Sequence, residues 1–302
     1  MHRPRRQFLK AAAGLAAVKS AAPAPAPAPT LPTVKLGKHD VTRLIIGSNP
    51  FYGYSHFNRI YDQVMAEWYT EERVIEVLKR CEANGINTWQ LGYRERAVSD
   101  LRKYRAEGGR MNVIALHNRD LTPDKIPELV KLGVLGIAHH GGVTDSQFRA
   151  GKHAEVREFL KRVRDAGLMV ALSSHNPRNI ELVQEQNWDI DFFMTCSFHL
   201  TRTAEEIRKI TGELPLPAGE VYLEGDPERM LAVVRRTPKP CLAFKILGAG
   251  RKIGSPQQID EAFRFTYRSI KPGDAAIVGM FPRFKDEVKE NANRVRGLLA
   301  AT

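Results

Sequence analysis

Several features that would assign a function class directly are missing from this sequence. Its 302 residues include only three cysteines, and the spacing of Cys81, Cys196 and Cys241 matches neither a disulfide framework nor a zinc site. No apolar run reaches the roughly 20 residues that a membrane-spanning helix needs, so we expect no stable membrane span. No Gly-x-Gly-x-x-Gly follows the first apolar run, which disfavours an open dinucleotide-binding sheet.

A nucleic-acid-binding pattern is also missing, although the chain is basic. It carries 46 Lys and Arg against 34 Asp and Glu, a net charge of +12. Part of the excess lies in the first ten residues, and the rest is scattered, as at Lys79-Arg80 and Arg235-Arg236. No basic stripe alternates with aromatic residues, so we expect solvated helix faces and no nucleic-acid partner.

The N-terminus predicts an export signal. Arg5-Arg6-Gln7-Phe8-Leu9-Lys10, followed by a short Ala-rich run, is similar to a twin-arginine signal. The Pro/Ala alternation over residues 23–29 cannot form a helix or a sheet. We therefore expect residues 1–33 to be a signal peptide and spacer, recognised by the twin-arginine translocase, and the mature protein to be periplasmic or otherwise exported. Such export would follow folding and permit a cofactor loaded in the cytoplasm. A disordered basic tail is the alternative.

Eight short apolar runs, each followed by a helical pattern, predict an α/β fold, a single (β/α)8 TIM barrel over residues 34–302. The runs are Leu44–Gly47, Ile86–Leu91, Asn112–Leu116, Leu135–Ala138, Met169–Leu172, Phe192–Cys196, Cys241–Leu247 and Ala275–Gly279. Several helical patterns open with proline and close on glycine, at Gly85, Gly133 and Gly167. Continuous apolar strands alternating with amphipathic helices indicate a parallel sheet, and eight units indicate closure. An open doubly wound sheet is the alternative.

Histidines gather where four consecutive runs end. Five of the nine histidines lie there: His117, His139, His140, His175 and His199. Active sites of such barrels lie at the C-terminal strand ends, and neighbouring ends converge when their side chains share the inward parity. We expect His117, His139, His175 and His199 to face one cavity, with His140 as the alternative to His139.

These imidazoles suit either acid/base catalysis or a divalent metal. A carboxylate usually completes a metal site, and the nearest candidates, Glu95 and Glu224, lie in predicted loops. Lys245 lies late on an apolar run, where burial of an unpaired ammonium is costly. We expect it to point into the barrel mouth toward an anion or a substrate oxygen, with a structural carboxylate as the alternative partner.

The ordered runs resemble the aldo-keto reductases over most of residues 34–300. The matching segments are Val34–Gly37 with Val41–Leu44 (opening hairpin and first strand), Gly85–Trp89 (second strand), Ile137–His139 (strand of the catalytic histidine), Ala243–Gly250 (seventh strand and glycine loop) and Ile277–Gly279 with Glu287–Asn291 (eighth strand and adenosine-binding helix). The resemblance implies NAD(P)-dependent carbonyl reduction. It also implies a cofactor site at Gly248, Arg251, Arg283, Glu290 and Asn291.

The catalytic tetrad of that family is altered in this chain. Only His139 matches; Gln90 stands at the Asp position and His117 at the Lys position. Tyr93 lies two residues before the tyrosine position, which Glu95 occupies. In the tetrad, the Lys and Asp lower the pKa of the tyrosine that protonates the nascent alkoxide. Their loss predicts that ordinary hydride transfer is absent.

Three functions stay open. The first is an enzyme using His117, His139, Tyr93 and Lys245 for acid/base or metal-assisted chemistry on a small carbonyl or polyhydroxy, sugar-like substrate. The second is an oxidoreductase with a tightly bound NAD(P), in which Tyr93 or Tyr52 is the acid. The third is a binding barrel without catalysis, which the clustered titratable histidines disfavour.

Overall fold

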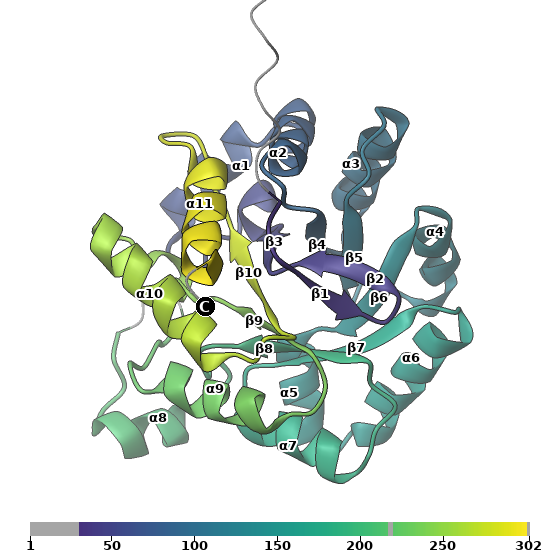
Figure 1. The fold of residues 1–302 in the computed structure, drawn as a ribbon. Helices are drawn as coiled ribbons and strands as arrows, with labels where there is room; N and C mark the ends of the chain where they lie inside the picture. The colour runs from purple at the N-terminus through teal and green to yellow at the C-terminus, as the bar shows by residue number, and fades with distance from the viewer. Residues whose placement is uncertain (1–29, 217–219, 301–302) are drawn as a thin grey trace, which may run out of the picture.

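The computed structural model describes residues 30–216 and 220–300, so residues 1–29 of the predicted signal peptide and spacer, residues 1–33, lie outside the described residues. Eight parallel strands close into a barrel in the order β10-β3-β4-β5-β6-β7-β8-β9 (Figure 1). Helices surround the barrel, and the predicted (β/α)8 barrel is confirmed. No helix in the described part of the chain is long and apolar enough to cross a bilayer.

The barrel strands are short and coincide with or overlap the predicted runs. They are β3 (Leu44–Gly47), β4 (Thr88–Gly92), β5 (Asn112–Leu116), β6 (Val134–His139), β7 (Met169–Ser174), β8 (Phe192–Cys196), β9 (Cys241–Phe244) and β10 (Ala275–Gly279). Alternate side chains face the barrel interior and the helices. We call the two buried clusters the inner core, which includes Ile45, Ile114 and Ala138, and the outer core, which includes Val113 and Ile137.

The helices also follow the predicted order, with two additions. They are α1 (Arg59–Trp68), α2 (Glu71–Ala83), α3 (Glu95–Ala106), α4 (Ile126–Lys131), α5 (Gly141–Arg149), α6 (His153–Asp165), α7 (Pro177–Glu185), α8 (Ala204–Thr211), α9 (Asp226–Arg236), α10 (Pro256–Ser269) and α11 (Glu287–Ala300). We did not predict α1, which buries only Met65, or α5, which opens on two glycines of low helix propensity. Gly85, Gly133 and Gly167 take left-handed φ values of 78°, 71° and 77° at helix ends, as the sequence suggested.

Short 3-10 turns occupy part of the loops at the C-terminal strand ends: η1 (Asn49–Tyr52), η2 (Pro123–Lys125) and η3 (Gly248–Gly250). The run predicted to continue to Leu247 ends as a strand at Phe244. Lys245 then turns the chain with a φ of 59°. It therefore follows β9 and is not part of it.

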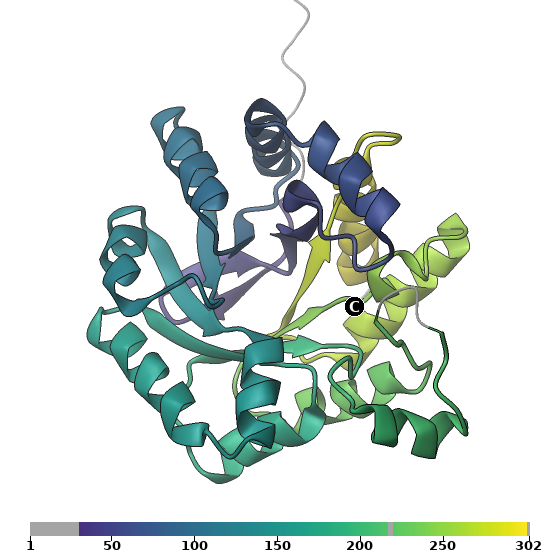
Figure 2. The same ribbon diagram turned by 180° about the vertical axis from the view of Figure 1, so that it is seen from behind.

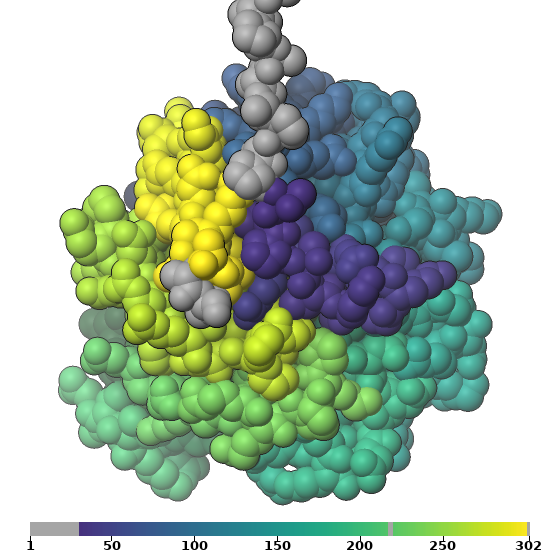
Figure 3. Space-filling model, in the orientation of Figure 1, coloured from purple at the N-terminus to yellow at the C-terminus, as the bar shows by residue number. Residues whose placement is uncertain are grey.

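A hairpin closes the N-terminal end of the barrel. Strands β1 (Thr33–Leu36) and β2 (His39–Thr42) pair antiparallel, and Val34, Leu36 and Val41 join the inner core. Figures 1 and 3 show the hairpin lying across this end, beside the C-terminal helix. The opposite end, seen in Figure 2, carries the loops that follow the barrel strands. A site for a ligand is therefore left to the C-terminal end.

Candidate functional site

His117 and His139 do not face the barrel mouth. His117 shares the parity of Val113 and Ala115, which belong to the outer core, and His139 shares the parity of Ile137. Their rings stack with centroids 4.7 Å apart, and Phe159 of α6 lies 4.1 Å from the His117 ring. The prediction for these two residues is wrong, because a shift of one residue at a strand end moves a side chain to the other face.

Both histidines are neutral structural groups between the strands and the helices. Burial lowers the pKa of His117 to about 4 and that of His139 to about 3, helped by neighbouring imidazoles. Nδ1 of His139 lies 2.7 Å from the Thr144 hydroxyl, which itself donates to the His140 carbonyl. The hydroxyl proton is thus committed, so Nδ1 of His139 carries the proton and donates to Thr144.

His140, the alternative named from the sequence, has the inward parity of Ala138. Its backbone is extended, and its Nδ1 accepts a hydrogen bond from Gly142 N at 3.1 Å, which caps α5. Burial lowers the pKa of His140 to about 4, with smaller contributions from His175 and Lys245. The imidazole is therefore neutral at pH 7, with its proton on Nε2.

His175 follows β7 and is oriented by a carboxylate that we did not predict. Its Nδ1 lies 3.0 Å from Oδ2 of Asp145 on α5, and its ring packs edge-on against Phe244. Burial opposes ionisation of Asp145, but hydrogen bonds from His175 and Ser174 outweigh it and lower the pKa of this carboxyl. A Cβ at Gly141 would lie 2.9 Å from Cε1 of His175, so a glycine is needed there. The Gly141-Gly142 pair after His140 was the one feature of the sequence that could have indicated this close approach to His175.

The fourth predicted ligand, His199, lies in the loop after β8. Its backbone N–H donates to Asp226, while its Nε2 is buried without a partner. Burial and the charge of Arg202 lower the pKa of His199. Across the described residues, no three His, Cys, Asp or Glu side chains are arranged to hold a metal ion. The four predicted ligands therefore do not form a metal site here, since two of them face the helix layer.

A cavity of about 220 Å³ opens at the barrel mouth, and we call it the mouth cavity. It lies among the ends of β3, β4, β9 and β10, the η1 and η3 loops, and the start of α11. Its polar lining includes Gln90, Lys245, Glu287 and Asn291, and the Nε2 of Gln90 is buried without a partner. Burial raises the pKa of Glu287, although its carboxylate accepts from Phe281 N. Sequence reasoning missed Glu287 as a site residue because it lies at a helix start.

Lys245 lines the mouth cavity within a network of polar groups. Its Nζ lies 3.0 Å from Glu220 and 3.2 Å from Nδ1 of His56, and 8% of its side chain is exposed. Burial would raise the pKa of Glu220, but contacts with His56 and Lys245 outweigh it and lower that pKa far below its usual range. Lys245 was expected either to point into the barrel mouth or to pair with a structural carboxylate. In the structure it lines the mouth cavity and also pairs with Glu220. His56 and Glu220 lie in loops and carried no sequence signal.

Backbone strain is concentrated around the same cavity. In the described residues, four non-glycine residues have positive φ, and three of them line the mouth cavity: His56 (56°), Lys245 (59°) and Ala249 (49°). Such conformations cost about 1–3 kcal/mol each and gather at functional sites. The strain therefore singles out the mouth cavity.

Tyr93 and most of the predicted cofactor residues do not reach this cavity. Tyr93 is buried, with its hydroxyl 3.4 Å from Glu95, and burial raises its pKa. Gly248 is buried against Phe198. The remaining contacts are Arg251 to the carbonyls of His56 and Gly248, Glu290 to Lys285 and Arg294, and Arg283 over Phe284.

Only Asn291 of the five predicted cofactor residues lines the mouth cavity. The cavity, about 220 Å³, is also smaller than the roughly 300–1,000 Å³ of ordinary ligand pockets. The residues as arranged therefore fit a small molecule and do not fit a dinucleotide.

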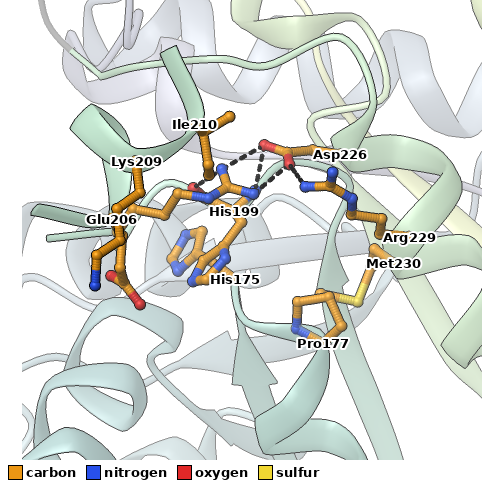
Figure 4. Close-up of a pocket in the computed structure, with 10 residues that line it drawn as sticks. His175, Pro177, His199, Glu206, Lys209, Ile210, Asp226, Arg229 and Met230 are labelled. Carbon is orange, nitrogen blue, oxygen red and sulfur yellow. Dashed lines mark hydrogen bonds and ion pairs between the residues drawn. The ribbon is translucent and has the colours of Figure 1, made fainter. Parts of the chain in front are cut away.

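A second cavity, of about 350 Å³, lies between the starts of α7 and α9 and helix α8, and we call it the side cavity (Figure 4). It is lined by His175, Pro177, His199, Arg202, Glu206, Lys209, Ile210, Asp226, Arg229 and Met230. His175 and His199 thus share a cavity, as predicted for them, but without His117 and His139.

Comparisons with known proteins support the fold only. No protein-family profile and no curated protein sequence matches the chain. Among solved structures, one described as a 2,5-diketo-D-gluconic acid reductase B is 12% identical with a TM-score of 0.52, over 89% of this chain and 92% of that one. The dihydropteroate synthase of Xanthomonas albilineans is 11% identical with a TM-score of 0.50 (90% and 98%), and that of Yersinia pestis is 10% identical, also at 0.50 (90% and 99%). The chain shares the TIM-barrel fold with these proteins.

Proposed function

We propose that this barrel is an enzyme acting on a small carbonyl or polyhydroxy, sugar-like substrate bound in the mouth cavity. The enzyme would remove a proton from the carbon next to the carbonyl group of this substrate. The observation that carries the proposal is Lys245, a buried ammonium on a strained backbone at the barrel mouth. Strain and a buried charge are both costly, and they occur together where a site is preorganised for chemistry.

Lys245 and Gln90 would hold the reacting oxygen of the substrate. The ammonium has three donors, and the Nε2 of Gln90 has no acceptor within the protein. Both side chains line the cavity, and the proposal places the carbonyl oxygen where it would accept a hydrogen bond from each. As the neighbouring carbon loses its proton, negative charge moves to that oxygen, where the fixed ammonium stabilises it.

Glu287 would accept the proton. It lines the same cavity, and burial raises the pKa of its carboxyl toward the range in which a carboxylate is an effective base. The walls around it are largely apolar, with Ile246, Ile277 and Phe281 among them. Such walls exclude water and strengthen the interaction of the charged groups with the substrate.

The test is exchange of carbon-bound protons with solvent. The protein would be incubated in D2O with small aldoses, ketoses and hydroxyketones, and loss of the α-proton signal followed by 1H NMR. Lys245→Met and Glu287→Gln should each slow exchange by about 100-fold or more. Lys152→Met, at an exposed ion pair with Glu155, is the matched control and should exchange at the wild-type rate.

Three results would count against the proposal. Exchange that is unchanged in folded Lys245→Met would remove Lys245 from the chemistry. Oxidation of NADPH with a carbonyl substrate at about 10 per second, a typical enzymatic rate, would favour the oxidoreductase alternative. Binding without turnover in either assay would favour the binding barrel.

We also propose that the protein is exported by the twin-arginine translocase, on the basis of Arg5-Arg6.

A further inference from the structure

The side cavity contains three hydrogen-bonding groups that the described protein leaves unpaired or only distantly paired. His175 is the first, with 10% of its side chain exposed. Asp145 receives five hydrogen bonds, from the Ser174 hydroxyl, the His175 N–H and Nδ1, Asn179 and Thr201. These hydrogen bonds place a proton of His175 on Nδ1, so in the neutral imidazole Nε2 is an acceptor, and no donor in the described protein reaches it.

His199 and Arg229 supply the other two groups. Nε2 of His199 is buried without a partner. The side chain of Arg229 is 61% exposed, and its guanidinium lies 3.7 Å from Asp226, beyond hydrogen-bond distance. The oxygens of Asp226 are already taken by Arg202 and by the His199 N–H. Figure 4 shows the two imidazoles between Glu206 and Lys209 on one side and Pro177, Arg229 and Met230 on the other.

The electrostatics favour an anionic ligand. The lining residues Arg202 and Asp226 neutralise each other in a buried pair, and Glu206 is occupied in capping α8. Lys209 pairs with Glu205 at 2.8 Å, so Arg229, 3.7 Å from Asp226, is the lining cation with the most distant partner. Ile210 and Met230 provide apolar surface. The volume of about 350 Å³ lies at the lower end of the roughly 300–1,000 Å³ usual for small-molecule sites.

We propose that the side cavity is a second binding site, distinct from the mouth cavity, for a small 2-hydroxycarboxylate. Its carboxylate binds Arg229, and its hydroxyl donates to Nε2 of His175 while lying against His199. A hydroxyl suits this place because it donates and accepts at once. A carboxylate suits Arg229 because the planar guanidinium binds it through two hydrogen bonds.

The experiment compares three ligands of nearly equal size on the full protein. Lactate has both groups, propionate lacks the hydroxyl, and lactamide lacks the charge. Binding is followed by calorimetry and by the NMR shifts of the His175 imidazole. We expect lactate to bind saturably. The affinity of propionate and of lactamide should be lower by about tenfold or more, since each lacks one of the two groups that bind the protein.

Variants locate the binding. His175→Asn keeps a donor toward Asp145 and removes the Nε2 acceptor, and Arg229→Gln removes the cation; each should weaken lactate binding about tenfold or more. Arg235→Gln, the same change at an exposed site on α9, should bind as wild type. If His175→Asn does not fold, Arg229→Gln still tests the proposal, because the side chain of Arg229 is mostly exposed and its replacement should leave the fold intact.

Lys245→Met separates this proposal from the proposed function, since it removes the mouth chemistry and should leave lactate binding unchanged. The absence of saturable lactate binding would overturn the second site. So would lactate affinity that is the same in wild type and in folded Arg229→Gln.

Discussion

At the scale of single residues, the pair His117 and His139 makes stability depend on pH. Their pKa values in the folded protein, about 4 and about 3, lie below the 6.5 of a free histidine. The unfolded chain therefore binds more protons in this range. The stabilisation from keeping both rings neutral is complete above pH 6.5 and is lost as the pH falls from 6.5 toward 3.

We predict that the free energy of unfolding falls by on the order of 4 kcal/mol between pH 7 and pH 5, because 1.5 pH units below the free pKa correspond to about 2 kcal/mol for each of the two histidines. Urea unfolding at the two pH values measures it. A His117→Gln, His139→Gln double variant should be less stable at pH 7 but lose much of this dependence. An equal dependence in the variant would show that other groups cause it.

At the scale of elements, the two ends of the barrel have separate tasks. The β1–β2 hairpin fills the N-terminal end, with Val41 fully buried in the inner core. The mouth cavity lies at the opposite ends of the strands. Substitutions in the hairpin should therefore alter stability and leave the mouth unchanged, as the division of faces in this fold implies.

Val41→Ala should destabilise the protein by about 2 kcal/mol, through lost apolar burial and the cavity left behind. Urea unfolding measures the loss, and the D2O exchange assay should show wild-type proton exchange below the unfolding transition. Lys35→Ala, at an exposed ion pair on the same hairpin, should change stability by less than about 1 kcal/mol. A selective loss of exchange in folded Val41→Ala would contradict this division.

At the scale of the whole molecule, export is the prediction that concerns the full chain. Changing Arg5 and Arg6 both to lysine should retain the protein in the cytoplasm, because the proposed signal depends on the arginine pair. Cell fractionation and immunoblotting measure the distribution. The control is the unchanged chain in a strain that lacks the twin-arginine translocase, where it should also be retained. Export in that strain would contradict the signal.

The alternation of apolar runs and helical patterns was enough to predict the barrel. Strands buried on both faces must be almost wholly apolar, so β3, β5, β8 and β10 could be located to the residue. Helix α5 escaped because two glycines open it, and its start is stabilised by a histidine cap. With α5 missing, Asp145, the partner of His175, could not be recognised.

The sequence by itself determined that histidines and a lysine stand at the strand ends of a TIM barrel. Only the tertiary structure decided which of them face the mouth. His139 and His140 differ by one position, and the pleat sends one toward α5 and α6 and the other inward. His56, Glu220 and Glu287 join the site from loops and a helix start, where no periodic pattern fixes the direction of a side chain. Periodicity is local and so predicts elements, whereas a site depends on contacts between residues far apart in the chain.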